Sequence, residues 1–297
     1  MMFRGYGHAN RTRRGIAIAA GLVSALALTA CSFEHDHALD TTPGDDLTAE
    51  REARGISHWG FASSSDQGAG GVATEGKGEN GEPVTLPKRT LTMAFAGDIM
   101  FEQHLLPLAL DAGALSELQS SLGAADLAVA NMETALTDRG APWPGKPFTF
   151  RAPTSAIDTV AGAGVDAITM ANNHAFDYGD QGAADTLNAK DNSPIPVVGI
   201  GRDEDEAYQP ATLEANGVKV AIIGASQVEE ETRLYRSATE NEYGIAAAAP
   251  DKWLARLIEE VKAAKKDHDV VVTMMHWGVE AEHCPGDEAI ATSRALE

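Results

Sequence analysis

The sequence predicts an α/β layered domain, because short apolar runs alternate along it with stretches of helical periodicity. Five apolar runs are typical of buried strands, at residues 91–96, 126–130, 166–170, 218–223 and 270–275. The clearest helix is predicted over residues 251–266, with Asp251 available as its N-cap, and Ser155 can cap an earlier helix. The apolar face of the clear helix is formed by Trp253, Leu254, Leu257, Ile258 and Val261. Such alternation of strand and helix is typical of layered α/β domains.

The N-terminal segment has the layout of a lipoprotein export signal. Four arginines precede an apolar run at residues 15–30, which ends directly before Cys31. We therefore expect residues 1–30 to be a signal peptide and Cys31 to be lipidated, which places the protein at the extracytoplasmic face of the cell membrane. The alternatives are a secretory signal with an incidental cysteine, and a membrane-spanning helix, although the run is shorter than the ~20 apolar residues that a bilayer requires.

Composition divides the remainder into a tether and a folded domain. Residues 31–87 are acidic and rich in glycine and serine, and they contain too little apolar surface to offset the entropy of ordering, so we expect a flexible tether. The folded domain is predicted over residues 88–297. The formal net charge of −21 disfavours contact with nucleic-acid phosphates, so no nucleic-acid partner is expected. A solvated acidic surface and a site that gathers cations are both compatible with this charge.

Four of the five predicted strands end in side chains that can bind metal or transfer protons. These are Asp98, Glu133, Asn173 with His174, and His276. Because ligand sites gather at the carboxyl ends of strands in open α/β sheets, we expect these side chains to meet. Carboxylate, amide and imidazole together suit Mn, Fe or Zn better than Ca. Each residue alone has an ordinary reading as well, since Asp98 can be a turn or cap residue, Glu133 a first-turn acid and His276 a satisfied polar side chain.

Four motifs around these residues resemble, in order, those of a known family. They are Ala-Gly-Asp-Ile-Met at 96–100, Asn-Met-Glu at 131–133, Ala-Asn-Asn-His-Ala-Phe-Asp-Tyr-Gly at 171–179 and His-Trp-Gly-Val-Glu at 276–280. They resemble the CapA/PgsA family of poly-γ-glutamate capsule synthesis proteins, which is itself similar to the calcineurin-like metallophosphoesterases. The resemblance implies a layered αββα sandwich with one or two divalent metal ions (Mn, Fe or Zn) held by Asp98, Glu133, Asn173 and His276. It also implies that His174 acts as an acid or oxyanion donor and that Asp177 orients either the imidazole of His174 or the loop that carries it.

The chain departs from the family pattern at two places. Met100 stands where the phosphoesterases carry a histidine, and no Gly-His-x-His motif follows the last predicted helix. We therefore expect the domain at 88–297 to be incomplete, with the sandwich lacking its last elements.

The export signal and the resemblance together indicate an exported lipoprotein that acts in the biosynthesis or export of poly-γ-glutamate capsule or of another cell-envelope polymer. Its expected partners are the membrane, through the N-terminal lipid anchor, and the capsule polymer or capsule-synthesis membrane proteins. Two alternatives are a metal-dependent hydrolase of the envelope that cleaves phosphoester or amide bonds, and an inactive truncated remnant.

Overall fold

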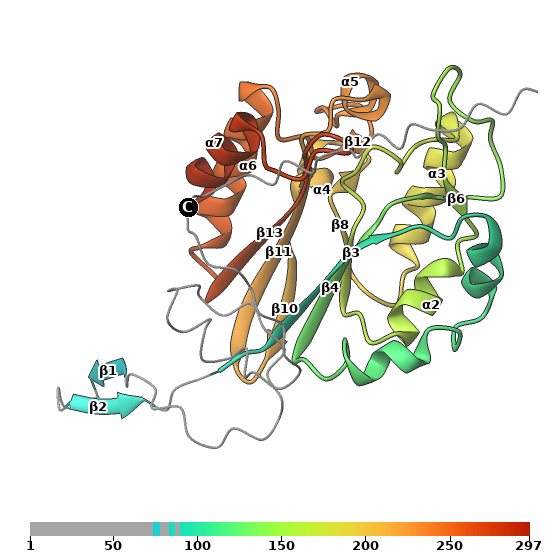
Figure 1. The fold of residues 1–297 in the computed structure, drawn as a ribbon. Helices are drawn as coiled ribbons and strands as arrows, with labels where there is room; N and C mark the ends of the chain where they lie inside the picture. Colours follow the sequence, from blue (N-terminus) through green and yellow to red (C-terminus); the bar gives the residue numbers. More distant parts are fainter. Residues whose placement is uncertain (1–73, 78–82, 87–89) are drawn as a thin grey trace, which may run out of the picture. The chain divides into compact units, whose positions relative to one another are not determined.

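The structure is a computed structural model that describes residues 74–77, 83–86 and 90–297 (Figure 1). The predicted signal peptide, Cys31 and most of the predicted tether lie outside the described residues. Within the tether range, β1 (Thr74–Lys77) pairs with β2 (Pro83–Leu86) in antiparallel orientation, which the composition did not predict.

The first sheet of the folded domain is parallel and has the strand order β3-β4-β7-β8. Its members are β3 (Met93–Ile99), β4 (Leu127–Met132), β7 (Ala167–Thr169) and β8 (Val197–Val198). Three of them confirm predicted strands. The first strand extends further than its apolar run, because β3 continues through Gly97 and Asp98, and a register shift between Phe95 and Asp98 places Asp98 opposite Asn131.

The second sheet joins β10 (Ala211–Ala215), β11 (Val218–Ser226) and β13 (Val270–His276) in that order. The β10–β11 hairpin turns at Asn216 and Gly217, both at positive φ, as a two-residue hairpin turn requires. β13 runs parallel to β11, and their register ends with Ser226 opposite His276. His276 therefore occupies the last position of its strand, at the carboxyl edge of the sheet.

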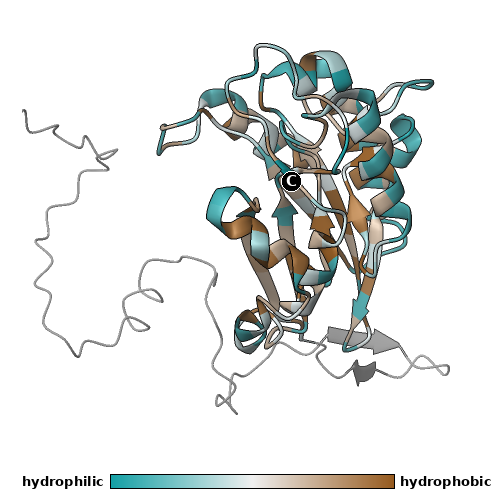
Figure 2. Ribbon diagram, turned by 90° about the vertical axis from the view of Figure 1, so that its right-hand side faces the viewer, coloured by the Kyte–Doolittle hydropathy of each residue, from teal (hydrophilic) through white to brown (hydrophobic). Residues whose placement is uncertain are grey.

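Three apolar clusters show that the two sheets pack face to face with helices outside. Alternate residues of β4 and β11 belong to different clusters, as a strand buried on both faces requires. The cluster between the sheets includes Leu127, Val129, Val220 and Ile222. The two outer clusters pack the other strand faces, such as Met132 in one and Ile223 in the other, against helices. This is the predicted αββα arrangement, and apolar residues concentrate along the central strands (Figure 2).

The helices lie on both outer faces of the sandwich (Figure 1). The first sheet is covered by η1 (Gln103–Leu110), α2 (Ala156–Gly162) and α3 (Gly179–Asp191), with η2 (Ser116–Ser120) preceding β4. The second sheet is covered by α4 (Glu204–Tyr208), α6 (Asp251–Ala264) and α7 (Asp287–Leu296), and α5 (Glu231–Arg236) follows β11. The remaining short strands are β5 (Ala135–Leu136), β6 (Arg151–Ala152), β9 (Ile200–Gly201) and β12 (Gly244–Ile245).

Two predicted helix caps are wrong in detail, although both helices form. Asp251 is the first residue of α6, and Pro250 occupies the N-cap position. Ser155 is the N-cap residue of α2, but its hydroxyl donates to the carbonyl oxygen of Ala109 in η1 rather than capping its own helix. Within residues 74–77, 83–86 and 90–297, no helix has the length and apolarity needed to cross a membrane.

The two sheets approach each other closely where β11 passes β7. A Cβ added at Gly224 would lie 2.1 Å from Oγ1 of Thr169, so only glycine fits at this point of β11. The same close approach draws the carboxyl ends of β7 and β11 together, and polar side chains follow both strands there.

Candidate metal centre

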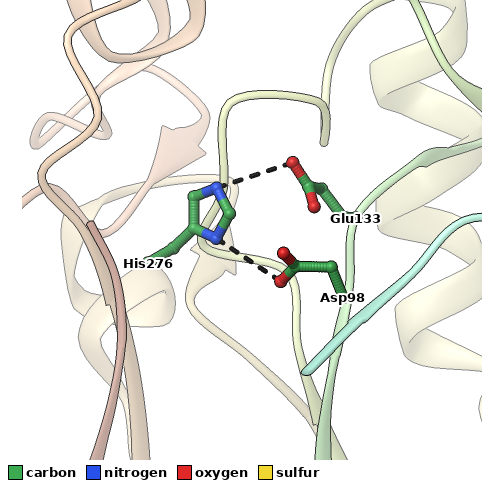
Figure 3. A group of neighbouring side chains, drawn as sticks. All are labelled: Asp98, Glu133 and His276. Carbon is green, nitrogen blue, oxygen red and sulfur yellow. Dashed lines mark ion pairs between the residues drawn. The ribbon is translucent and has the colours of Figure 1, made fainter. Parts of the chain in front are cut away.

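Three acidic and imidazole side chains converge at the carboxyl edge of the two sheets (Figure 3). Asp98 lies near the end of β3, Glu133 directly follows β4, and His276 ends β13. One ligand atom from each lies within 4.8 Å of the others. His276 Nδ1 is 3.8 Å from Asp98 Oδ1, and His276 Nε2 is 3.6 Å from Glu133 Oε1. The expected meeting of these three side chains, drawn from both sheets, is therefore what the structure contains.

Asn173 brings the fourth predicted ligand to the same place. Its side-chain oxygen lies 2.8 Å from His276 Nε2, which donates to it when the proton is on that nitrogen. The donor atoms at the edge are thus two carboxylates, one imidazole and one amide oxygen. This mixed set of oxygen and nitrogen donors fits a transition-metal ion such as Mn, Fe or Zn.

Two buried asparagines connect these groups, and sequence reasoning did not assign them a role. Asn131 donates through Nδ2 to Asp98 Oδ1 at 2.7 Å, and the same nitrogen lies 3.3 Å from His276 Nδ1. Asn172 donates to Asn131 Oδ1 at 3.0 Å and accepts from the main-chain N–H of His174. Because partners on both sides fix each amide, this network orients the carboxylate of Asp98 and the ring of His276 in the candidate metal centre.

His174 and Asp177 form a buried pair beside the carboxylates. His174 Nδ1 is 2.6 Å from Asp177 Oδ2, and its Nε2 faces Glu133 Oε1 at 3.8 Å. Phe150 stacks on the imidazole with 4.0 Å between ring centroids, and its main-chain N–H donates to Asp177 Oδ2 at 2.7 Å. The ring is therefore held with one nitrogen on Asp177 and the other turned toward Glu133.

A buried lysine in the loop 138–150 is the largest feature of the site that sequence reasoning missed. Lys146 Nζ lies 2.7 Å from Asp177 Oδ1 and 3.3 Å from Glu230 Oε2, and it donates to the main-chain oxygen of Asn173. The only signal in the sequence was a single lysine within a segment rich in proline and glycine, Pro-Trp-Pro-Gly-Lys-Pro. Such a segment is compatible with any surface loop, so it did not predict a contact with the site.

The electrostatics of the site favour the arrival of a cation. Burial, together with the negative charges of Asp98 and Glu230, raises the pKa of Glu133 from 4.5 to about 8, although Lys146 acts in the opposite direction. Burial also lowers the pKa of His276, so that its ring is neutral at neutral pH and has a lone pair for a metal ion. The metal-free protein therefore keeps Glu133 protonated at pH 7, and a bound cation would favour loss of that proton.

Comparison with known proteins places the chain among capsule proteins. It is similar to the PGA biosynthesis protein CapA of Bacillus subtilis (strain 168), with 28% identity over 74% of this chain and 58% of the relative. It is also similar to the capsule biosynthesis protein CapA of Bacillus anthracis, with 27% identity over 69% of this chain and 51% of the relative. The chain thus spans only about half the length of these curated relatives.

A solved structure and a family model also match. A hypothetical protein from Thermus thermophilus aligns with a TM-score of 0.37 and 20% identity over 69% of this chain and 63% of that chain. The family model of the bacterial capsule synthesis protein PGA_cap matches residues 92–297, which include all four segments that build the candidate metal centre. The chain belongs to the PGA_cap family of bacterial capsule synthesis proteins.

Proposed function

We propose that this protein acts in the biosynthesis of a glutamate polymer of the capsule or cell envelope, and that it does so with a divalent metal ion. Asp98, Glu133, Asn173 and His276 would hold the ion. The observation that carries the proposal is the convergence of these side chains from both sheets at one edge of a PGA_cap domain. The names of the curated relatives support capsule synthesis, and in the Bacillus subtilis protein the name gives PGA as the product.

The acidity of the protein is a second argument for a bound cation. The formal net charge is −21, so a polyanion such as polyglutamate would be repelled unless cations lie between it and the protein. A metal ion at the edge can supply that positive charge locally. A metal ion also polarises phosphoryl or carbonyl oxygens and lowers the pKa of bound water.

The pair of His174 and Asp177 favours a second candidate function, metal-dependent hydrolysis of phosphoester or amide bonds in the envelope. Asp177 holds His174 through Nδ1, so Nε2 on the Glu133 side is the atom that can give or accept a proton. Phe150 stacked on the ring keeps it from rotating away. A purely structural capsule role does not require an imidazole held in this way.

The test combines metal analysis with turnover and capsule formation. Purified protein is assayed for Mn, Fe and Zn content, and for hydrolysis of bis(p-nitrophenyl) phosphate and of a γ-glutamyl amide. Asp98→Ala and His174→Ala are compared with the unmodified chain, and each is tested for restoring capsule to a deletion strain. Loss of turnover and of capsule in both variants supports a metal-dependent hydrolase. Full complementation by both variants would refute a role for the metal centre in capsule synthesis.

We also propose that the protein is anchored to the extracytoplasmic face of the cell membrane through acyl chains on Cys31. The support is the order of the basic segment, the apolar run and the cysteine in the sequence. Membrane anchoring would bring the site to capsule-synthesis membrane proteins and the nascent polymer. Mass spectrometry of the N-terminal peptide from membrane fractions should find a diacylated or triacylated Cys31. An unacylated Cys31, whether free or in a disulfide with Cys284, would contradict the anchor.

A further inference from the structure

Lys146 is buried at a point where three separate segments meet. Its side chain is 2% exposed, although it comes from a loop, and it lies between the turn at 172–178 and the residues that begin α5. The ammonium group faces Asp177 and Glu230 at salt-bridge distance and donates to the main-chain oxygen of Asn173. A lysine is rarely buried without such partners, since removing the charge from water is costly.

The loop that carries Lys146 is docked firmly against the turn that carries Asn173. The main-chain N–H of Trp143 donates to the carbonyl oxygen of Asp177 at 2.7 Å, and that of Phe150 donates to its carboxylate. Gly140 has φ +81°, and a Cβ there would lie 2.1 Å from the carbonyl oxygen of Tyr178. These hydrogen bonds and the close packing at Gly140 hold the loop against the turn, and so they hold Lys146 in one position.

The main-chain oxygen of Asn173 receives two donors from two segments. Lys146 Nζ is one, and Thr232 Oγ1 in α5, at 2.5 Å, is the other. The side-chain oxygen of the same residue lies 2.8 Å from His276 Nε2. Fixing the backbone of Asn173 thus also fixes the position of its amide oxygen at the candidate metal centre.

We propose that Lys146, assisted by Thr232, is a positioning residue that fixes Asn173 for metal binding and holds the pair of Asp177 and His174 beside the metal centre. This inference rests on the proposed metal-dependent function. A lysine ammonium has three N–H donors, and Lys146 Nζ donates to the main-chain oxygen of Asn173 and to Asp177 Oδ1. It also lies 3.5 Å from His174 Nδ1 and forms an ion pair with Glu230 Oε2 at 3.3 Å, so its remaining N–H is directed at these groups. No donor remains for a substrate, so the residue acts through Asn173 and Asp177 and does not touch the reacting groups.

The test compares Lys146→Met with a matched control, Lys190→Met, in the full chain. Lys190 also donates to a main-chain oxygen, that of Ile200 at 2.6 Å, and pairs with Glu206 at 3.0 Å, with a side chain 15% exposed. Three quantities are measured: Mn²⁺ affinity by calorimetry, the absorption spectrum of bound Co²⁺, and hydrogen–deuterium exchange of peptides covering residues 172–178 in the metal-free protein. A third variant, Thr232→Val, removes the second donor alone.

Lys146→Met should weaken Mn²⁺ binding by about tenfold or more, change the Co²⁺ spectrum and speed exchange at 172–178, as expected for loss of a residue that orients a metal ligand. Thr232→Val should do the same to a smaller extent, and Lys190→Met should leave all three quantities unchanged. Unchanged affinity and exchange in Lys146→Met would overturn the inference, and so would an equal loss in Lys190→Met. If the unmodified chain binds no metal, the proposed function fails, and the exchange of residues 172–178 still decides whether Lys146 fixes this turn.

Discussion

Replacing Glu133 by glutamine should change how the stability of the metal-free protein depends on pH. The pKa of Glu133 is raised from 4.5 in the unfolded chain to about 8 in the fold, so between these values the folded state keeps a proton that the unfolded state has lost. Because the folded state then binds more protons, its free energy of unfolding falls as pH rises through this interval. At ~1.4 kcal/mol for each pH unit, ionising Glu133 costs the fold on the order of 3–5 kcal/mol by pH 8 to 9. Glutamine keeps the shape and a donor for Asp98 but cannot ionise.

The assay is urea unfolding of both proteins in the presence of a chelator at several pH values from 5 to 9. The two should have similar stability near pH 5, and Glu133→Gln should become the more stable by a few kcal/mol at pH 8 to 9. Added Mn²⁺ should stabilise the unmodified protein much more than the variant, because the ion takes the place of the proton. A difference between the two proteins that stays constant from pH 5 to 9 would refute this account of the electrostatics.

Three further predictions concern proton release, the imidazole and the packing of the sheets. Binding of Mn²⁺ at pH 7 should release close to one proton, chiefly from Glu133. The number of protons released is measured by calorimetry in buffers of different ionisation enthalpy, and a binding enthalpy that does not depend on the buffer would contradict this prediction. His174→Gln should lower turnover of a phosphodiester by about 100-fold or more while metal affinity changes by less than about tenfold, since the ring is not one of the proposed ligands. Equal losses of turnover and of metal affinity would indicate instead that His174 is a metal ligand. Gly224→Ala should destabilise the fold by about 1–3 kcal/mol in urea unfolding, because its Cβ would meet Thr169 at 2.1 Å, whereas Gly286→Ala, with open space around it, should have little effect.

The positions of the site residues at the strand ends were predictable, because polar side chains that can bind metal come directly after the apolar runs. Glu133 and His276 stand at the points where hydrophobic runs stop, and the carboxyl ends of parallel strands share one edge. The exact end of a strand was less predictable. The strand that carries Asp98 continues through Gly97 beyond its apolar run, because pairing with β4, and not hydrophobicity, decides where β3 ends.

The residues that support the ligands could not be found from local sequence. Asn131 meets Asp98 only because of the register shift in the β3–β4 pair, and no pattern in either strand specifies that shift. Lys146 meets Glu230 although the two lie far apart in the sequence, and both belong to loops or helix starts without periodicity. Contacts of this kind depend on tertiary packing, which a single sequence does not state. The β1–β2 hairpin was missed for a simpler reason: the segment around it is rich in glycine, serine and acidic residues, and this composition predicted a tether without strands.

The most direct measurement of the central claim is a crystal structure of the protein soaked with Mn²⁺, with data collected at the absorption edge of manganese. We expect an anomalous difference peak about 2.0–2.3 Å from the donor atoms of Asp98, Glu133, Asn173 and His276. The peak should be absent from the same experiment on Asp98→Ala. An unmodified protein that shows no peak at this edge of the sheets, or binds manganese only at other surface carboxylates, would contradict the claim that these four side chains form a metal centre.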